Sequence, residues 1–207
     1  MTLDAKTAFF DSIADKWDGW EDLPTLATKL AAGLDELAVG DSERVLDVGC
    51  GTGNLTRALL DRLSGSGSVI AADISSRMIE AARRKIEDPR VSWLTTDAGH
   101  LPIADAECDR VFCCAVWPHF DDREGVATEL ARVLRPGGSL HVWHLIAREK
   151  VNEIHAGASE AVSADVLPPA NETATLLTAA RFRVVTATES NGRYLVTAVK
   201  PERWSPS

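Results

Sequence analysis

The sequence predicts an α/β fold: a seven-stranded, mostly parallel sheet that ends in an antiparallel C-terminal hairpin and carries an N-terminal helical cap. From Arg44 onward, short apolar runs alternate with stretches of helical periodicity, as strands and helices do in such sheets. The run VLDVGCGTGNLT (45–56) fits a buried strand, a glycine turn and the start of a helix. Near the C-terminus, two strand-like runs flank Asn191-Gly192, a dipeptide that favours a hairpin turn.

The first 40 residues precede this alternation and are expected to form two helices. Phe9, Phe10, Ile13, Trp17 and Trp20 recur at helical spacing and form one aromatic stripe. The stripe either packs the cap against the body of the protein or covers a bound ligand, and the sequence leaves both interpretations open.

The remaining elements follow from the same patterns. Strands are predicted at 44–48, 68–73, 91–95, 109–115, 139–145, 182–189 and 193–199, and helices at 54–63, 76–87, 123–134 and 172–180.

Acidic residues mark the ends of the first three strands, where ligands bind in open α/β sheets. Asp47 lies just before the glycine turn, Asp73 ends the second strand, and Asp97 follows the third. A carboxylate at Asp73 is placed to accept two ribose hydroxyls, and Asp97 to reach an adenine amino group. These positions predict an adenosine-containing ligand.

The glycine turn narrows the class of ligand. Gly49, Gly51 and Gly53 give the order GxGxG, whereas oxidoreductases that bind a dinucleotide pyrophosphate favour GxGxxG. The pattern indicates a ligand with an adenosine end and an amino-acid end but no phosphate. A nicotinamide-dependent oxidoreductase is the weaker alternative.

Four ordered segments, LDVGCGTGN (46–54), AADIS (71–75), TDAGHLPIADAECDRV (96–111) and RVLRPGG (132–138), resemble those of class I S-adenosylmethionine-dependent methyltransferases. The resemblance covers nearly the whole chain. It implies a Rossmann-like fold and S-adenosyl-L-methionine as the cofactor. The cofactor-binding residues that it implies are Trp17, Asp47, Gly49, Cys50, Gly51, Gly53, Asp73, Ile74, Met78, Asp97, Ala98 and Ala115.

Two positions depart from family patterns. The segment FFDSIADKWDGW resembles the cap of the ubiquinone and menaquinone C-methyltransferases, but Trp17 stands where those enzymes usually have tyrosine, so only an indole N–H remains as a donor. Arg181 stands where the family often has a glycine in a left-handed turn. If the turn is kept, arginine costs about 1 kcal/mol there; otherwise the helix ends differently.

Histidines are the candidates for chemistry on the methyl acceptor. His119 follows the fourth strand and His144 ends the fifth, so both are predicted to face the acceptor as catalytic residues, with His119 as general base. His141 should point to the opposite face of its strand. His155 lies in the stretch 146–170, which is expected to cover the active site as an insertion within a single domain of residues 1–207 (cap 1–40, core 41–200).

The acceptor pocket is expected to be aromatic with a few polar groups. Trp117, Phe120 and Trp143, together with the tryptophans of the cap, are expected to supply apolar walls, which suits an aromatic or quinone-like metabolite. The three histidines favour a polar substrate pocket. A metal site formed by them is the less favoured alternative, because their spacing matches no metal motif. Two other functions remain open: a module that binds S-adenosylmethionine without turnover, and a metal- or metalloid-linked methyltransferase.

Composition limits the partners. The net charge of −9, with no basic block to offset it, disfavours nucleic acid, so a small molecule is expected. No run approaches the roughly 20 apolar residues of a membrane span, and a cytoplasmic location without a membrane partner is expected. The four cysteines (Cys50, Cys108, Cys113 and Cys114) fit core thiols, and a thiol triad for arsenic is the alternative.

Overall fold

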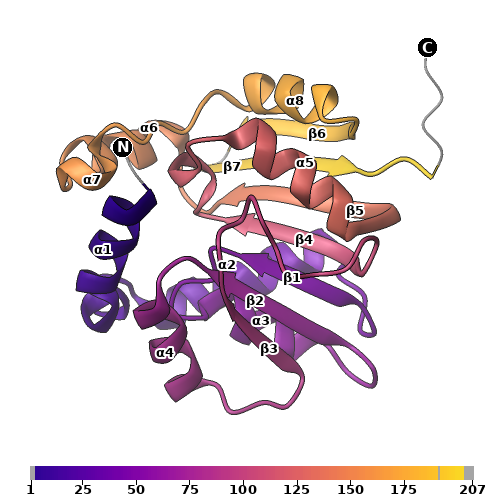
Figure 1. Ribbon diagram of the computed structural model, residues 1–207, viewed down its shortest axis with the longest axis horizontal. Coiled ribbons are helices and arrows are strands. Elements are labelled where there is room, and N and C mark those ends of the chain that lie inside the picture. Colours follow the sequence, from indigo (N-terminus) through magenta and orange to yellow (C-terminus); the bar gives the residue numbers. More distant parts are fainter. Residues whose placement is uncertain (1–2, 191, 203–207) are drawn as a thin grey trace.

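The computed structural model describes residues 3–190 and 192–202, and these form a seven-stranded sheet in the order β3-β2-β1-β4-β5-β7-β6 (Figure 1). The first five strands run parallel, and β7 is antiparallel to both β5 and β6. The predicted mixed sheet with its C-terminal hairpin is therefore confirmed. The strands are β1 (Arg44–Val48), β2 (Ser68–Asp73), β3 (Val91–Thr95), β4 (Cys108–Cys114), β5 (Leu134–His144), β6 (Arg183–Ser190) and β7 (Arg193–Val199).

The largest boundary error concerns β5, which begins five residues before the predicted Ser139. Leu134 already pairs with Cys108 of β4, and the backbone of Gly137 and Gly138 exchanges hydrogen bonds with Lys200 at the end of β7. Pairing with β4 on one side and with the end of β7 on the other extends the strand through a Pro-Gly-Gly stretch, which by itself predicts a turn. At the β6–β7 hairpin, Asn191 lies outside the described residues, and Ser190 pairs with Arg193 across the turn.

Helices cover both faces of the sheet and define two buried clusters. Residues of α2, α3 and α4 pack on one face around Val45, Val69 and Phe112. Residues of α5 and α8 pack on the other around Leu46 and Val111. Neighbouring residues of one strand enter opposite clusters because side chains alternate across a sheet. The helices are α2 (Leu23–Glu36), α3 (Asn54–Arg62), α4 (Ser76–Lys85), α5 (Arg123–Val133) and α8 (Ala170–Ala179).

The N-terminal cap consists of α1 (Leu3–Ile13), a 3-10 helix η1 (Ala14–Trp20) and α2. The sequence predicted two α-helices here, and the 3-10 segment between them was not foreseen. The helix α1 lies beside α4 and the short α7 (Glu160–Ser163) (Figure 1). Asp18 of η1 accepts hydrogen bonds from Thr52 Oγ1 at 2.6 Å and from Lys85 Nζ at 2.6 Å. These bonds fasten the cap to the glycine turn and to α4.

The end of α8 decides the question raised by Arg181, whose φ is +68°. The Phe182 N–H bonds the carbonyl of Leu177 at 3.0 Å, and the Arg181 N–H bonds that of Thr178 at 3.0 Å. The left-handed turn is kept with an arginine in it, at a cost of about 1 kcal/mol relative to glycine.

The stretch 146–170 folds back over the carboxyl ends of the strands. It holds two helices, α6 (Arg148–Ala156) and the short α7. Asn152 ties the two ends of the stretch together: its Oδ1 accepts from the Leu167 N–H at 2.8 Å, and its Nδ2 donates to the Leu167 carbonyl at 3.2 Å. Among the described residues, no helix has the length and apolar character needed to cross a membrane.

Candidate active site

A cavity of about 840 Å³ opens at the carboxyl ends of β1, β2, β4 and β5, under the cap and the stretch 146–170. Its volume suits a cofactor together with a small second ligand. All of the predicted cofactor-binding residues except Gly53 line this cavity. Gly53 instead caps the N-terminus of α3, where a Cβ would lie 2.9 Å from Ile86 Cδ1.

The glycine turn forms the floor of the cavity. Gly49 has φ +67° and lies so close to Val116 that any Cβ there would collide with its side chain. Gly51 has φ +52°, and the atom nearest to a Cβ on it would be Trp17 Nε1 at 3.9 Å. The main chain at Gly51 therefore faces open space, and a ligand can lie directly against it.

Asp73 is held rigidly beside this turn. Its two carboxylate oxygens accept from the Gly51 N–H and the Ser75 N–H, both at 2.8 Å. Burial raises the pKa of Asp73, although these backbone bonds oppose the shift. Each oxygen has a second lone pair, so the carboxylate can accept two further hydrogen bonds from a ligand.

The other two acids at the strand ends differ in environment. Asp47 is 1% exposed and accepts from Thr56 Oγ1 at 2.7 Å, and burial raises its pKa to about 7. Asp97 is partly exposed, and one of its oxygens accepts from the Gly99 N–H at 2.9 Å. Asp47 is therefore a buried group beneath the turn, whereas the second oxygen of Asp97 lies at the rim, 3.8 Å from His100 Nδ1.

The aromatic residues divide between the cavity and the core. Trp17 and Phe120 line the cavity, while Trp20 is 62% exposed and does not. The prediction that Trp117 and Trp143 form walls is wrong: both are almost fully buried away from the cavity. Each packs instead among buried side chains of the sheet and its covering helices.

His119 is paired with an acid that sequence reasoning missed. Its Nδ1 lies 2.7 Å from Asp165 Oδ2, and the side chains of the pair are 13% and 9% exposed. Because a carboxylate accepts the hydrogen bond, Nδ1 carries the proton and Nε2 keeps its lone pair. Burial lowers the pKa of His119, while the bond to Asp165 opposes that shift, so the ring is neutral near pH 7.

Lys6 of α1 completes the arrangement around this pair. Its ammonium group lies 2.9 Å from Asp165 Oδ1, and it donates to Asp121 Oδ1 at 2.6 Å and to the His119 carbonyl at 2.8 Å. Its side chain is only 4% exposed. Burial raises the pKa of Asp165, but the hydrogen bonds from His119 and Lys6 outweigh burial and hold it below its ordinary value.

Two further histidines line the same region. The His155 Nδ1 lies 2.6 Å from the Asp165 carbonyl, and its ring centroid is 4.8 Å from that of His119. His144 is 2% exposed, burial lowers its pKa to about 3, and its Nε2 has no hydrogen-bond partner among the described residues. His144 lies at the predicted position, but no hydrogen bond from the described residues orients its Nε2, so His119 is the better candidate for a base.

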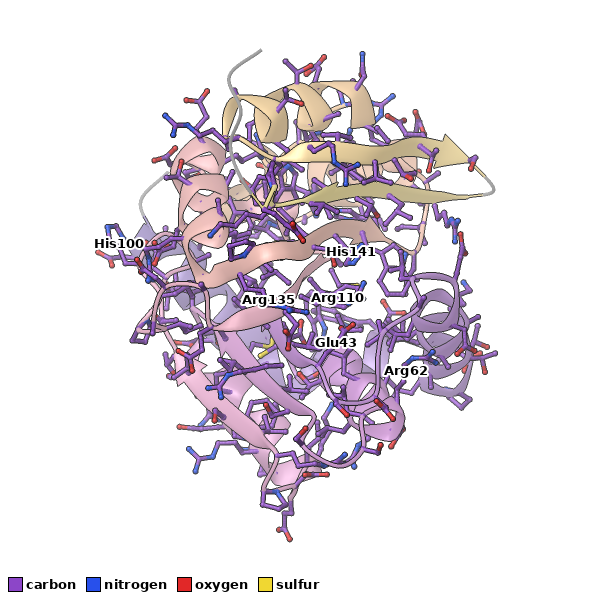
Figure 2. The ribbon with its side chains drawn as sticks, turned by 90° about the vertical axis from the view of Figure 1, so that its right-hand side faces the viewer. Glu43, Arg62, His100, Arg110, Arg135 and His141 are labelled. Carbon is purple, nitrogen blue, oxygen red and sulfur yellow. The ribbon has the colours of Figure 1, made fainter. Side chains whose placement is uncertain are left out.

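His141 lies away from this cavity, whereas His100 lies at its rim. His141 points away from the cavity, as expected, and accepts from Arg110 Nη1 at 2.8 Å in a buried network that includes Glu43 (Figure 2). His100 projects from the edge of the molecule, with 91% of its side chain exposed (Figure 2).

A metal or metalloid site finds no support in the part of the chain that the structure describes. There, no group of three or more histidine, cysteine or acidic side chains lies close enough to hold a metal ion. Burial also raises the pKa of all four thiols, whereas thiolates are the binding form. Cys113 and Cys114 enter opposite clusters because side chains alternate along a strand.

Comparison with known proteins agrees with this geometry. Residues 45–138 match the family model described as a methyltransferase domain. The chain is 37% identical over 130 residues to the methyltransferase GfsG of Streptomyces halstedii. It is 30% identical over 180 residues to an O-methyltransferase of Pyrenophora dematioidea, a match that covers 80% of this chain and 67% of that one.

A third relative is the ubiquinone/menaquinone biosynthesis C-methyltransferase UbiE of Hahella chejuensis, 31% identical over 166 residues, with 77% of this chain and 66% of that one covered. The match to GfsG covers 61% of this chain but only 46% of that protein, so the chain spans about half of its length. A solved S-adenosylmethionine-dependent methyltransferase of Aquifex aeolicus has the same fold, with a TM-score of 0.76 and 21% identity over 92% of this chain and 98% of that one.

The chain belongs to the class I S-adenosylmethionine-dependent methyltransferases. Its cofactor is S-adenosylmethionine, and the residues of the cavity fit that molecule. The open main chain at Gly51 suits the amino-acid end. The lone pairs of Asp73 suit two ribose hydroxyls, and the second carboxylate oxygen of Asp97 suits the adenine amino group. We infer these residue roles from the geometry.

Replacing Asp73 with alanine should weaken S-adenosylmethionine binding by about 2 kcal/mol or more, roughly a thirtyfold rise in Kd. The variant loses the ribose acceptor and frees the Gly51 N–H from its partner. Titration calorimetry on the folded protein measures the change. Asp97→Ala is the matched control, and we expect a smaller effect because Asp97 is partly exposed. Unchanged affinity in Asp73→Ala would remove Asp73 from the cofactor site.

Proposed function

We propose that this methyltransferase transfers the methyl group of S-adenosylmethionine to a hydroxyl oxygen of a small, largely apolar acceptor, with His119 as general base. The observation that carries the proposal is the 2.7 Å contact between His119 Nδ1 and Asp165 Oδ2. A carboxylate in that position fixes the tautomer and orientation of the ring and leaves Nε2 as the proton acceptor.

Methyl transfer requires the protein to align the acceptor oxygen with the methyl group and to accept one proton. S-adenosylmethionine supplies an electrophilic methyl group and is left as the neutral thioether S-adenosylhomocysteine. As the acceptor oxygen forms its bond to that methyl carbon, the hydroxyl proton passes to His119 Nε2. Asp165 stabilises the resulting imidazolium, which later releases the proton to solvent.

The environment of His119 suits this role. Burial lowers its pKa, so the neutral, proton-accepting ring is present near pH 7. Phe10 packs against the ring edge at a centroid distance of 5.1 Å, and Val151 and Ile154 line the cavity nearby. These walls favour an aromatic acceptor.

Methyl transfer to a carbon atom is the second candidate. It is supported by the similarity of the chain to a ubiquinone/menaquinone biosynthesis C-methyltransferase and by the likeness of the cap segment to such enzymes. The His119–Asp165 pair favours oxygen, because a carbon acceptor already ionised to an enolate needs no such base. The relative named as an O-methyltransferase agrees with that preference.

Product analysis separates these functions. The protein is incubated with methyl-labelled S-adenosylmethionine and a panel of phenols and carbon acceptors, and the products are analysed by mass spectrometry and NMR. We expect methoxy products together with S-adenosylhomocysteine. A carbon-bound methyl group in the product would overturn the proposal in favour of the second candidate. Tight cofactor binding without turnover of any acceptor would favour a binding module.

A further inference from the structure

We propose that His155 forms a second hydrogen-bond-accepting subsite beside His119, and that the enzyme selects aromatic acceptors that carry two hydroxyl groups. This inference rests on the proposed function and names its substrate class. The two rings lie 4.8 Å apart between centroids, and both residues line the cavity.

Asp165 fixes the proton positions of both rings. His155 Nδ1 lies 2.6 Å from the backbone carbonyl of Asp165, and His119 Nδ1 lies 2.7 Å from its carboxylate. Carbonyl and carboxylate oxygens only accept hydrogen bonds, so Nδ1 is the donor in each ring. With the proton on Nδ1, the Nε2 atom of each ring can accept a hydrogen bond from a ligand.

Two acceptor nitrogens in one wall of the cavity favour ligands that donate hydrogen bonds over ligands that only accept them. No protein hydrogen bond to Nε2 of His119 or His155 occurs among the residues that the structure describes. A ligand that displaces water from them must supply donors, or leave a polar atom unsatisfied at about 1–3 kcal/mol. One hydroxyl gives its proton to His119 during transfer. A second hydroxyl on the same ring satisfies His155.

The same polarity disfavours ligands that offer only carbonyl oxygens. A quinone in its oxidised form offers only carbonyl oxygens, which accept hydrogen bonds. No hydrogen bond can then form between these oxygens and the two Nε2 atoms, because neither side supplies a hydrogen. The remaining surface is mostly apolar, with Phe10, Val151 and Ile154 among the lining side chains. These features together describe a dihydroxylated aromatic molecule.

The test compares 1,2-dihydroxybenzene and 1,3-dihydroxybenzene with phenol and 2-methoxyphenol, at pH 8 and with saturating S-adenosylmethionine. We expect kcat/KM for at least one diol to exceed that for phenol by about 10- to 100-fold, which corresponds to the cost of one unsatisfied acceptor. In His155→Phe, which keeps a ring but no acceptor, the ratio should fall to within about threefold of one. Ile154→Ala, a change in the neighbouring lining residue, should keep the ratio.

Binding separates failure of this inference from failure of the proposed function. Calorimetry with protein saturated with S-adenosylhomocysteine measures the affinity for each phenol without any methyl transfer. The diol preference should appear in Kd for the wild type and for His119→Ala, and vanish in His155→Phe. If no methoxy product forms but this pattern holds, the subsite stands and the proposed reaction fails. Equal affinity for diols and phenol in the wild type, or a preference that survives His155→Phe, would overturn the subsite.

Discussion

Replacing His119 with alanine should lower kcat for a hydroxylated acceptor by roughly 10²-fold or more, because the ring is a buried proton acceptor that Asp165 orients at the cavity. Affinity for S-adenosylmethionine should change little, since the glycine turn and Asp73 lie apart from the ring's hydrogen bonds. Steady-state kinetics and calorimetry measure the two quantities. A loss confined to KM would mean that the ring only binds the acceptor.

His141→Ala is the control for this variant, and the structure changes what it should show. His141 is 2% exposed, accepts from Arg110 and bonds Thr197 Oγ1 at 3.0 Å. Its removal should lower the melting temperature but leave kcat of the folded enzyme near the wild-type value. Equal, small effects of both substitutions on kcat would contradict a base at His119.

The acid limb of the pH profile gives an independent signature of the pair. Burial lowers the pKa of His119, so kcat/KM should stay constant at neutral pH and fall only as the pH drops below the ordinary histidine value near 6.5. The bond to Asp165 opposes that shift, so Asp165→Asn should move the limb to still lower pH and reduce kcat. The positive charge of Lys6 also lowers the pKa of His119, so Lys6→Met should move the acid limb to higher pH. The charged or titratable groups that face His119 are Lys6 from α1, Asp165 and His155 from the stretch 146–170, and His144 from β5.

Deletion of residues 1–22 should abolish turnover and leave the sheet folded. The deletion removes Lys6 from Asp165 and Trp17 from the cavity, and it opens the site to water. In the described chain, the residues of the two buried clusters begin only at Leu30, with Leu26 packed against them, so the core does not depend on the deleted segment. Circular dichroism measures folding, and product formation measures activity.

Two single substitutions divide the roles within the cap. Trp17→Ala should lower turnover because Trp17 lines the cavity, whereas Trp20→Ala should stay near wild type because Trp20 is 62% exposed. Full activity of the truncated protein would reduce the cap to a packing element.

The sequence by itself determined the fold class, the cofactor and the position of His119. The strand, the glycine turn and the helix at residues 45–63 are determined by residues that lie close together in the sequence. The turn could be predicted because its backbone has positive φ angles, which favour glycine. Strand alternation likewise separated His141 from the cavity, because that rule depends only on the position of a residue along its strand.

The tertiary structure alone decided how His119 is oriented. Asp165 lies 46 positions beyond His119 in the chain, and Lys6 lies 113 positions before it, in segments whose own patterns gave no sign of a shared site. A single lysine on a cap helix and a single aspartate in an insertion are ordinary surface residues until packing buries them together. The cost of burying an unpaired charge then makes their pairing obligatory, and that pairing sets the tautomer of His119.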